Sequence, residues 1–177
     1  MSIHDQAQGG IAAPSHEIAR MSPASRAVVR CGEDASGKVS AAIGLTLPHD
    51  ACRAAVRDQL TALWLGPDEW LLLAPESEHW AASLMRNLDG IACSAVEVSD
   101  RQVAFAVVGG RAETILASGC PLDLDASAFP VGMCTRTLFH KAPVVLWRTD
   151  HDRFHLEVWR SFGAYVEALL TLAAAEA

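Results

Sequence analysis

Gly119-Cys120-Pro121-Leu122-Asp123-Leu124, with its sequel Phe129-Pro130-Val131-Gly132, marks the point where the chain changes from helix to strand. The stretch predicts the end of one helix, a tight corner that carries an aspartate, and a return into strand. Gly119 suits the left-handed residue that commonly follows a helix, and Pro121 prevents the helix from continuing. The corner therefore separates a helix from the group of strands that comes after it.

The residues before this corner predict a buried strand and a short helix. From Gln102 to Val108 both alternating faces are apolar, which is typical of a strand in the interior of a sheet. Gly109-Gly110 then opens the short helix that ends at Gly119. A glycine pair before a helix either binds an anion or allows tight packing, and the sequence leaves both interpretations open.

The residues after the corner predict three strands and a terminal helix. The strands are expected at 135–139, 144–148 and 154–160, and a polar turn at 150–153 joins the last two. The helix is expected to begin at Ser161, because the apolar residues from Phe162 to Ala173 recur with helical spacing. Such a helix buries one face against a sheet.

The first half of the chain predicts a similar mixture, after an extended arm over residues 1–25. We expect strands at 27–31, 43–47 and 93–98, a turn at 34–38, a hairpin over 62–74 and a helix from Ser77. In the hairpin, Trp64 and Trp70 flank the turn, as a cross-strand aromatic pair or as a stacking platform for a cofactor. Because strands come in adjacent pairs with helices between the groups, the order favours an α+β fold of ferredoxin-like type, with antiparallel sheets and helices on one face.

Composition excludes several classes of function. The 177 residues are 51% apolar and carry a formal net charge of −7, which disfavours binding to nucleic acid or to an anionic membrane. The longest apolar run is too short to cross a bilayer, and no secretory signal is visible near the start. The five cysteines are scattered and form no C-x-x-C motif, which predicts reduced thiols in a cytoplasmic protein.

Several segments together resemble the gamma subunit of bacterial heterotetrameric sarcosine oxidase. The resemblance runs from about residue 26 to the C-terminus, and the segments keep the order and approximate spacing of that family. The segments are Leu65-Gly-Pro-Asp-Glu-Trp-Leu-Leu-Leu73, Val98-Ser-Asp-Arg-Gln-Val-Ala-Phe105, Gly119-Cys-Pro-Leu-Asp-Leu124, Phe129-Pro130, Cys134-Thr-Arg-Thr-Leu138, Val145-Leu-Trp-Arg148 and Leu156-Glu-Val-Trp-Arg-Ser-Phe162.

The resemblance implies a fold similar to the folate-binding domains of glycine-cleavage aminomethyltransferases. It implies two related lobes, which we expect at residues 26–97 and 98–177. It also implies a non-catalytic subunit of a complex that oxidatively demethylates sarcosine to glycine, with alpha, beta and delta subunits as partners. The cofactors FAD, FMN, NAD and tetrahydrofolate are then expected in the partner subunits and none in this chain.

Asp123 is the residue on which the main alternative depends. It resembles, by its place in the order of elements, the folate-proximal acid of the aminomethyltransferases, which would make the chain a stand-alone tetrahydrofolate-binding one-carbon transfer protein. An aspartate in a corner more commonly accepts backbone N–H groups and holds the turn. The pterin-binding glutamate of that family also lacks a counterpart in register, since Glu157 lies on the strand that follows the relevant segment. A third interpretation is a regulatory module with a small ligand between its lobes.

Other candidate binding residues lie at or near the ends of strands in the resembling segments. In an obligate subunit, arginines at these places are expected to bridge to partner chains, whereas exposed arginines are otherwise ordinary solvated charges. Trp159 is expected to point away from the core, where an aromatic side chain suits an interface. The candidates for a partner interface or a vestigial folate site are Arg101, Gln102, Asp123, Arg136, Arg148, Trp159 and Arg160.

Metal and nucleophile chemistry find little support in the sequence. His151 and His155 are four residues apart, but the expected turn and strand do not supply the helical spacing or third ligand that a metal site needs. No nucleophile elbow or Ser/His/Asp set is recognisable. The sequence therefore predicts no catalytic residue and no metal ligand.

Overall fold

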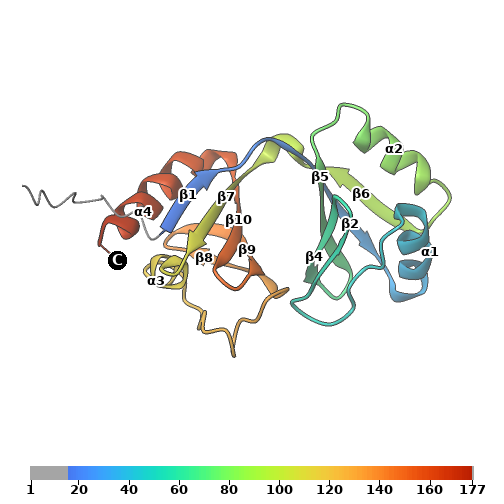
Figure 1. Cartoon of the computed structure of the whole chain (residues 1–177). Helices are drawn as coiled ribbons and strands as arrows, with labels where there is room; N and C mark the ends of the chain where they lie inside the picture. The colour runs from blue at the N-terminus through green and yellow to red at the C-terminus, as the bar shows by residue number, and fades with distance from the viewer. Residues whose placement is uncertain (1–15, 177) are drawn as a thin grey trace, which may run out of the picture.

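The computed structural model describes residues 16–176 as four layers, with two sheets packed face to face and helices on the outer face of each. Figure 1 shows α3 and α4 outside one sheet and α1 and α2 outside the other. All strand pairings in both sheets are antiparallel. The α+β class and the two lobes of antiparallel sheet expected from the sequence are confirmed.

The first lobe is built around a five-stranded sheet in the order β3-β4-β5-β2-β6. In the hairpin between β4 and β5, Trp64 lies opposite Trp70 as expected, and the ring of Trp70 packs edge-on against His49. The elements of this lobe are β2 (Ala24–Cys31), α1 (Glu33–Ile43), β3 (Ala54–Arg57), β4 (Leu60–Gly66), β5 (Glu69–Pro75), α2 (Trp80–Asn87) and β6 (Cys93–Glu97).

The second lobe is built around a five-stranded sheet in the order β1-β7-β10-β9-β8. Its edge strand β1 comes from the start of the described chain and pairs with β7. The elements of this lobe are β1 (His16–Arg20), the 3-10 turn η1 (Ser99–Arg101), β7 (Gln102–Gly109), α3 (Ala112–Ala117), β8 (Cys134–Phe139), β9 (Ala142–Asp150), β10 (Arg153–Trp159), the 3-10 turn η2 (Arg160–Phe162) and α4 (Gly163–Glu176).

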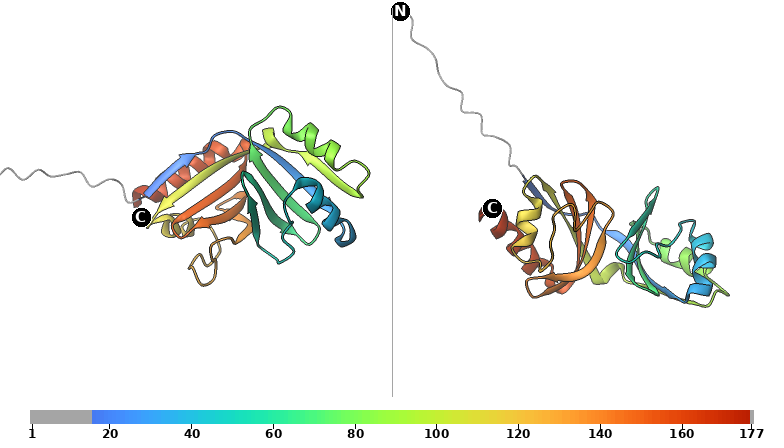
Figure 2. Two further views of the ribbon diagram at one scale, coloured as in Figure 1. Left: turned by 45° about the vertical axis from the view of Figure 1, so that its right-hand side comes forward. Right: turned by 90° about the horizontal axis from the view of Figure 1, so that it is seen from below.

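The division of the chain into residues 1–25, 26–97 and 98–177 stays a prediction. The structure shows, in addition, that part of the expected N-terminal arm forms a strand of the second lobe. The strand β1 lies in the sheet of the second lobe, and the chain crosses to the first lobe over residues 21–23 before β2 begins (Figure 2). The rest of the expected arm, residues 1–15, lies outside the described residues.

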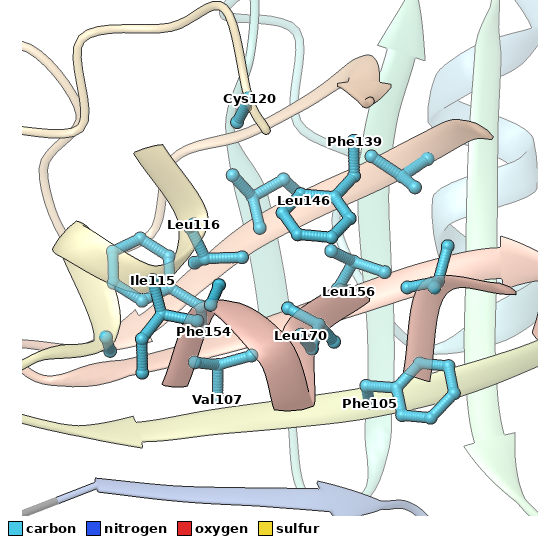
Figure 3. Close-up of a cluster of buried hydrophobic side chains, with 14 of the residues drawn as sticks. Phe105, Val107, Ile115, Leu116, Cys120, Phe139, Leu146, Phe154, Leu156 and Leu170 are labelled. Carbon is cyan, nitrogen blue, oxygen red and sulfur yellow. The ribbon is translucent and has the colours of Figure 1, made fainter. Parts of the chain in front are cut away.

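Three apolar clusters hold the layers together. The largest lies under α3 and α4 and contains Phe105, Phe139 and Phe154 (Figure 3). A second lies under α1 and α2. A third lies between the two sheets and includes Leu71, Cys134 and other buried side chains from both lobes. The inner faces of both sheets are therefore covered at this level, and β10 is buried on both faces from Phe154 to Val158.

Two expected elements in the first lobe are wrong: the turn at 34–38 and the strand at 43–47. Both ranges overlap α1, which runs to Ile43, and the residues after it are not in a strand. Ser36 tolerates the helix because its hydroxyl donates to the carbonyl of Glu33, and burial of Ala35 and Val39 stabilises that face. Gly44, with φ 73°, is the left-handed residue that ends the helix.

Gly119 does not have the left-handed conformation expected of it, since it is absent from the positive-φ glycines of the described chain. Its backbone passes close to β8 instead. A Cβ at this position would lie 2.9 Å from the ring of Phe139 and closer still to His140. Gly119 is therefore required by close packing, and its carbonyl accepts the N–H of His140 at 2.7 Å.

No helix in the described residues is long and apolar enough to span a membrane.

Candidate functional site

A cleft of about 310 Å³ opens between the two sheets, with walls from both lobes. Its apolar walls come from β4 and β5 on one side and from β9 on the other. The polar side chains come from η1, β7, β8 and β10. The cleft is lined by Leu65, Leu71, Arg101, Gln102, Arg136, Thr137, Pro143, Val144, Val145, Glu157 and Trp159. Four of these, Arg101, Gln102, Arg136 and Trp159, are among the candidates expected from the sequence.

The register of β8, β9 and β10 arranges the inner face of the second sheet in rows. In the innermost row Trp147 lies between Cys134 and His155, under the first lobe. In the next row Val145 lies between Arg136 and Glu157. In the last row, Leu138 lies opposite Pro143, and Trp159 closes β10 on the same face. Successive rows therefore run from the covered interior to the open end of the cleft.

A buried ion pair closes the inner end of this cleft. Nε of Arg26, on β2 of the first lobe, donates to Oε2 of Glu157 on β10 at 2.8 Å, and both side chains are almost fully buried. Nε2 of His155 lies 2.8 Å from the other carboxylate oxygen, Oε1. Nη1 of Arg26 donates to the carbonyl of Ala24 at 3.0 Å. The carboxylate of Glu157 thus joins the two lobes and has a partner on each oxygen.

The electrostatics of Glu157 follow from these contacts. Burial alone would raise the pKa of its carboxyl group. The hydrogen bond and electrostatic attraction of His155, together with those of Arg26, outweigh burial and hold that pKa below its usual range. Glu157 is therefore an ionised structural group at neutral pH, and it does not have the raised pKa of a general acid.

Gln102 contributes a free donor to the same cleft. The residue is 6% exposed, and its Oε1 accepts a hydrogen bond from Nη2 of Arg101 at 3.3 Å. Its Nε2 makes no hydrogen bond to any residue from 16 to 176, and it lies where the cleft meets a second hollow of about 430 Å³ between the lobes. An amide donor beside a buried carboxylate can bind a small polar molecule.

The open end of the cleft is apolar, with cationic side chains beside it. Trp159 is 48% exposed and Leu138 is 45% exposed, and Pro143 is exposed as well. Arg136 forms a forked pair with the carboxylate of Glu69 on β5, so it bridges the lobes at the rim. We call Leu138, Pro143 and Trp159 the open row.

Two candidates from the sequence lie outside the cleft, at the corner. Asp123 is exposed, and its Oδ1 accepts the N–H of Asp125 at 3.0 Å, which is the turn-holding contact considered above. Arg148 is fully buried and donates to the carbonyls of Leu124, Phe129 and His151, at 3.0, 3.1 and 2.6 Å. Its Nη2 also pairs with Glu113, so Arg148 holds the corner together from inside.

The remaining candidates do not converge on the cleft. Arg160 pairs with exposed Asp100 at 3.0 Å and borders the second hollow. His151 is exposed and contacts Asp152, whereas His155 is buried against Glu157, so the two histidines have separate partners. Within residues 16–176 no three His, Cys, Asp or Glu side chains are grouped to hold a metal ion.

Arg26 and His155 are site residues that the sequence did not indicate. Arg26 and Glu157 are 131 residues apart in the chain, so no local motif connects them. A weak signal exists in the strand Phe154–Val158, where polar side chains at 155 and 157 alternate with apolar ones. That pattern usually marks a solvent-facing side, but here the other lobe covers it.

Comparisons of the sequence with known proteins agree on a single family. The sarcosine oxidase gamma subunit family matches residues 31–176. The sarcosine oxidase subunit gamma of Arthrobacter sp is 33% identical over 126 residues, which cover 71% of this chain and 62% of that protein. The subunit gamma of Corynebacterium sp. (strain P-1) is 33% identical over 132 residues, or 74% of this chain and 65% of that protein. The chain thus spans a little under two thirds of the length of these relatives.

Solved structures with the same fold extend the comparison. A chain of heterotetrameric sarcosine oxidase from Corynebacterium sp. U-96, in complex with pyrrole 2-carboxylate, superposes with a TM-score of 0.86 at 26% identity, over 93% of this chain and 87% of that chain. The glycine cleavage system aminomethyltransferase T from Bartonella henselae superposes with a TM-score of 0.65 at 17% identity, over 90% of this chain and 49% of that chain. The second likeness concerns the fold alone.

Proposed function

This chain belongs to the sarcosine oxidase gamma subunit family, and from that premise we propose that it is a non-catalytic subunit of a heterotetrameric sarcosine oxidase. The complex would oxidatively demethylate sarcosine to glycine in a folate-linked reaction. Its alpha, beta and delta subunits would be the partners of this chain and would hold FAD, FMN, NAD and tetrahydrofolate. The contribution of this chain would then be the surface that it offers to those partners.

The observation that carries this proposal is the open row. Leu138, Pro143 and Trp159 expose apolar side chains at one end of a sheet face whose innermost row lies under the first lobe. Exposed aromatic side chains in an apolar setting are typical of the centre of protein interfaces, and tryptophan is enriched among residues that dominate binding energy. Arg101, exposed beside the row, would add a cation to the rim of the interface.

The charge distribution inside the cleft supports a structural role for its ionisable groups. Both oxygens of Glu157 are occupied by Arg26 and His155, and the forked contact with Glu69 occupies Arg136. Asp123, the acid on which a catalytic alternative depends, accepts a hydrogen bond from a backbone N–H in the corner. Each of these groups therefore holds elements of the fold in place.

Co-expression with the alpha, beta and delta subunits tests the proposal. We expect the chain to co-purify with a tagged partner, and we expect omission of the chain to lower the yield of a complex that oxidises sarcosine. Trp159→Ala should weaken association about 30-fold, as a hot-spot loss of about 2 kcal/mol implies. Sarcosine oxidation by the purified chain alone would contradict the proposal.

Tyr165→Ala provides the matched control for this experiment. Tyr165 is 39% exposed, but it lies on α4, on the outer side of the second sheet. The Tyr165→Ala variant should therefore co-purify with the partner subunits as the wild type does. Equal losses for Trp159→Ala and Tyr165→Ala would show that the open row is not the interface.

Gln102 favours a second candidate, tetrahydrofolate binding by this chain itself. Its free Nε2 offers a hydrogen-bond donor to a pterin edge inside the cleft. Titration of the chain with tetrahydrofolate, monitored by calorimetry, tests this candidate. Saturable binding that Gln102→Leu removes would support it, whereas loss of binding in Asp123→Asn would place the ligand at the corner.

A further inference from the structure

Strands β2 and β6 place two cysteines directly opposite each other. In the antiparallel pairing of these strands, Cys31 lies across from Cys93. Both side chains belong to the apolar cluster under α1 and α2, so they point to the same face of the sheet. Both thiols are free, and Cys31 is buried whereas Cys93 is half-buried.

The hydrogen bonds of this ladder show which type of pair the two cysteines form. The N–H of Val98 donates to the carbonyl of Arg26 at 2.8 Å, which places residues 26 and 98 at a hydrogen-bonding position just beyond the end of the ladder. Pair types alternate along an antiparallel ladder, which makes Cys31 and Cys93 a non-hydrogen-bonded pair. In agreement, the N–H of Cys31 donates to Asp68 and that of Cys93 to Ile91.

This pair type brings side chains close enough for a bond. In non-hydrogen-bonded pairs the Cα atoms are about 4.5 Å apart, and the side chains are closer than in the alternating pairs. Disulfides span Cα separations of about 4.4–6.8 Å. The backbone of β2 and β6 therefore already has the spacing that a cross-strand disulfide requires.

Cys52 and Cys134 are also close to each other, but their backbone arrangement and burial are less favourable for oxidation. The N–H of Cys134 donates to the carbonyl of Cys52 at 2.9 Å beside the isolated bridge between Arg53 and Met133, so this pair lies outside any regular strand ladder. Cys52 has a left-handed backbone with φ 60°. Cys134 is fully buried between the sheets, where burial raises the pKa of its thiol to about 12.

We propose that Cys31 and Cys93 are an oxidisable pair, which a peroxide converts into a cross-strand disulfide that fastens the edge strand β6 to β2. In the first step the thiolate of half-buried Cys93 attacks one oxygen of hydrogen peroxide, forms a sulfenic acid and releases hydroxide. The thiol of Cys31 then attacks that sulfur, the S–S bond forms, and the sulfenic oxygen leaves as water with the proton of the thiol. Two thiols and one hydrogen peroxide thus give one disulfide and two waters.

The bond would change the behaviour of the first lobe. It closes a loop from 31 to 93 that contains α1, β3, β4, β5 and α2, and cross-links over long loops restrict the unfolded chain most. It also fixes β6, an edge strand on which Val96 is 54% exposed. Burial raises the pKa of both thiols, so the reaction should accelerate as pH rises through the alkaline range.

Peptide mapping of the full chain after treatment with hydrogen peroxide tests the proposal. We expect a peptide that joins Cys31 to Cys93, a loss of two of the five free thiols, and recovery of both with dithiothreitol. The thermal midpoint of unfolding should rise on oxidation of the wild type and of Cys120→Ser, and it should not rise in Cys93→Ser. Because Cys93 is half-buried, its serine variant should fold even where Cys31→Ser does not.

Three results would overturn the proposal. They are a chain that keeps five free thiols, a cross-link between Cys52 and Cys134 in place of the expected one, and over-oxidation of Cys93 to a sulfinic acid without any cross-link. The experiment needs no partner subunit, so its outcome is independent of the proposed function.

Discussion

The two lobes have the same strand order but complete their sheets from different parts of the chain. Written from the opposite edge, the second sheet is β8-β9-β10-β7-β1, which matches β3-β4-β5-β2-β6 strand for strand. In the first lobe the closing strand β6 follows α2 directly. In the second lobe the strand at that position is β1, from the start of the described chain. The comparison teaches that the second lobe depends on a segment that lies before the first lobe in the sequence.

The lobes also differ in the connection between their first helix and the next strand. In the first lobe this connection spans residues 44–53, and exposed Arg57 donates to the carbonyl of Gly44. In the second lobe it spans residues 118–133 and wraps around fully buried Arg148, whose donors bind three of the surrounding carbonyls. A longer connection has more backbone carbonyls to satisfy away from water, and a buried guanidinium satisfies several at once.

The largest effect is expected where the two lobes are joined. Glu157→Ala removes the carboxylate that pairs with Arg26 and leaves a buried guanidinium without its counter-charge. We expect the free energy of unfolding to fall by about 3–5 kcal/mol, measured by urea denaturation. Asp68→Ala, which breaks the exposed pair with Arg30, is the control and should leave the free energy nearly unchanged. Equal effects of the two variants would show that the buried pair does not couple the lobes.

A slightly smaller effect is expected at the corner of the second lobe. Arg148→Ala leaves the carbonyls of Leu124, Phe129 and His151 without a donor, and unfolding should cost about 2–4 kcal/mol less. Arg57→Ala removes the corresponding exposed contact in the first lobe and should have little effect. Denaturation curves of both variants, recorded side by side, measure the difference between the connections. If Arg57→Ala lowered the free energy of unfolding as much as Arg148→Ala, the two connections would not differ in the way proposed.

Acid should weaken the junction between the lobes in a defined direction. Because folding lowers the pKa of Glu157, its contribution to stability is complete above the ordinary pKa of a glutamate and is lost as pH falls through the lower, folded value. His155 and Arg26 are the charged or titratable groups that contact its carboxylate. The free energy of unfolding should therefore fall more steeply below pH 5 in the wild type than in Glu157→Gln. Parallel curves would contradict this prediction.

The smallest effect is expected at the rim. Arg136 and Glu69 also connect the lobes, but the side chain of Arg136 is 52% exposed. Arg136→Ala should lower the free energy of unfolding by about 0.2–1 kcal/mol, because solvent screens an exposed pair. A change near that of Glu157→Ala, in the same denaturation assay, would mean that burial does not distinguish the two bridges.

The sequence predicted the strands and hairpin well where apolar residues alternate and turn residues follow. It missed α1 because Ser36 and Gly37 are typical of turns, while the helix is stabilised by burial of Ala35 and Val39 in the folded lobe. It could not assign β1 to the second sheet, since the partner strand β7 lies more than eighty residues further along the chain. Pairing at such distances is decided by the packed structure and leaves no local pattern.

The sequence predicted only some of the residues of the site, because contacts between distant strands leave no local pattern. Arg101, Gln102, Arg136 and Trp159, which lie in or beside the strands that the sequence predicted, all line one cleft. Arg148 and Asp123 were grouped with them but belong to the corner, where they hold the backbone. Arg26 and His155 were not anticipated, because a buried polar network looks like a solvent-facing strand until the second sheet covers it.

Oxidative footprinting of Trp159 is the most direct test of the claim that the open row receives a partner subunit. Hydroxyl radicals should oxidise Trp159 readily in the isolated chain, where it is 48% exposed, and several-fold more slowly once the chain is assembled with its partners. Tyr165, on the outer helix α4, should react equally in both states. Equal oxidation of Trp159 before and after assembly would contradict the account.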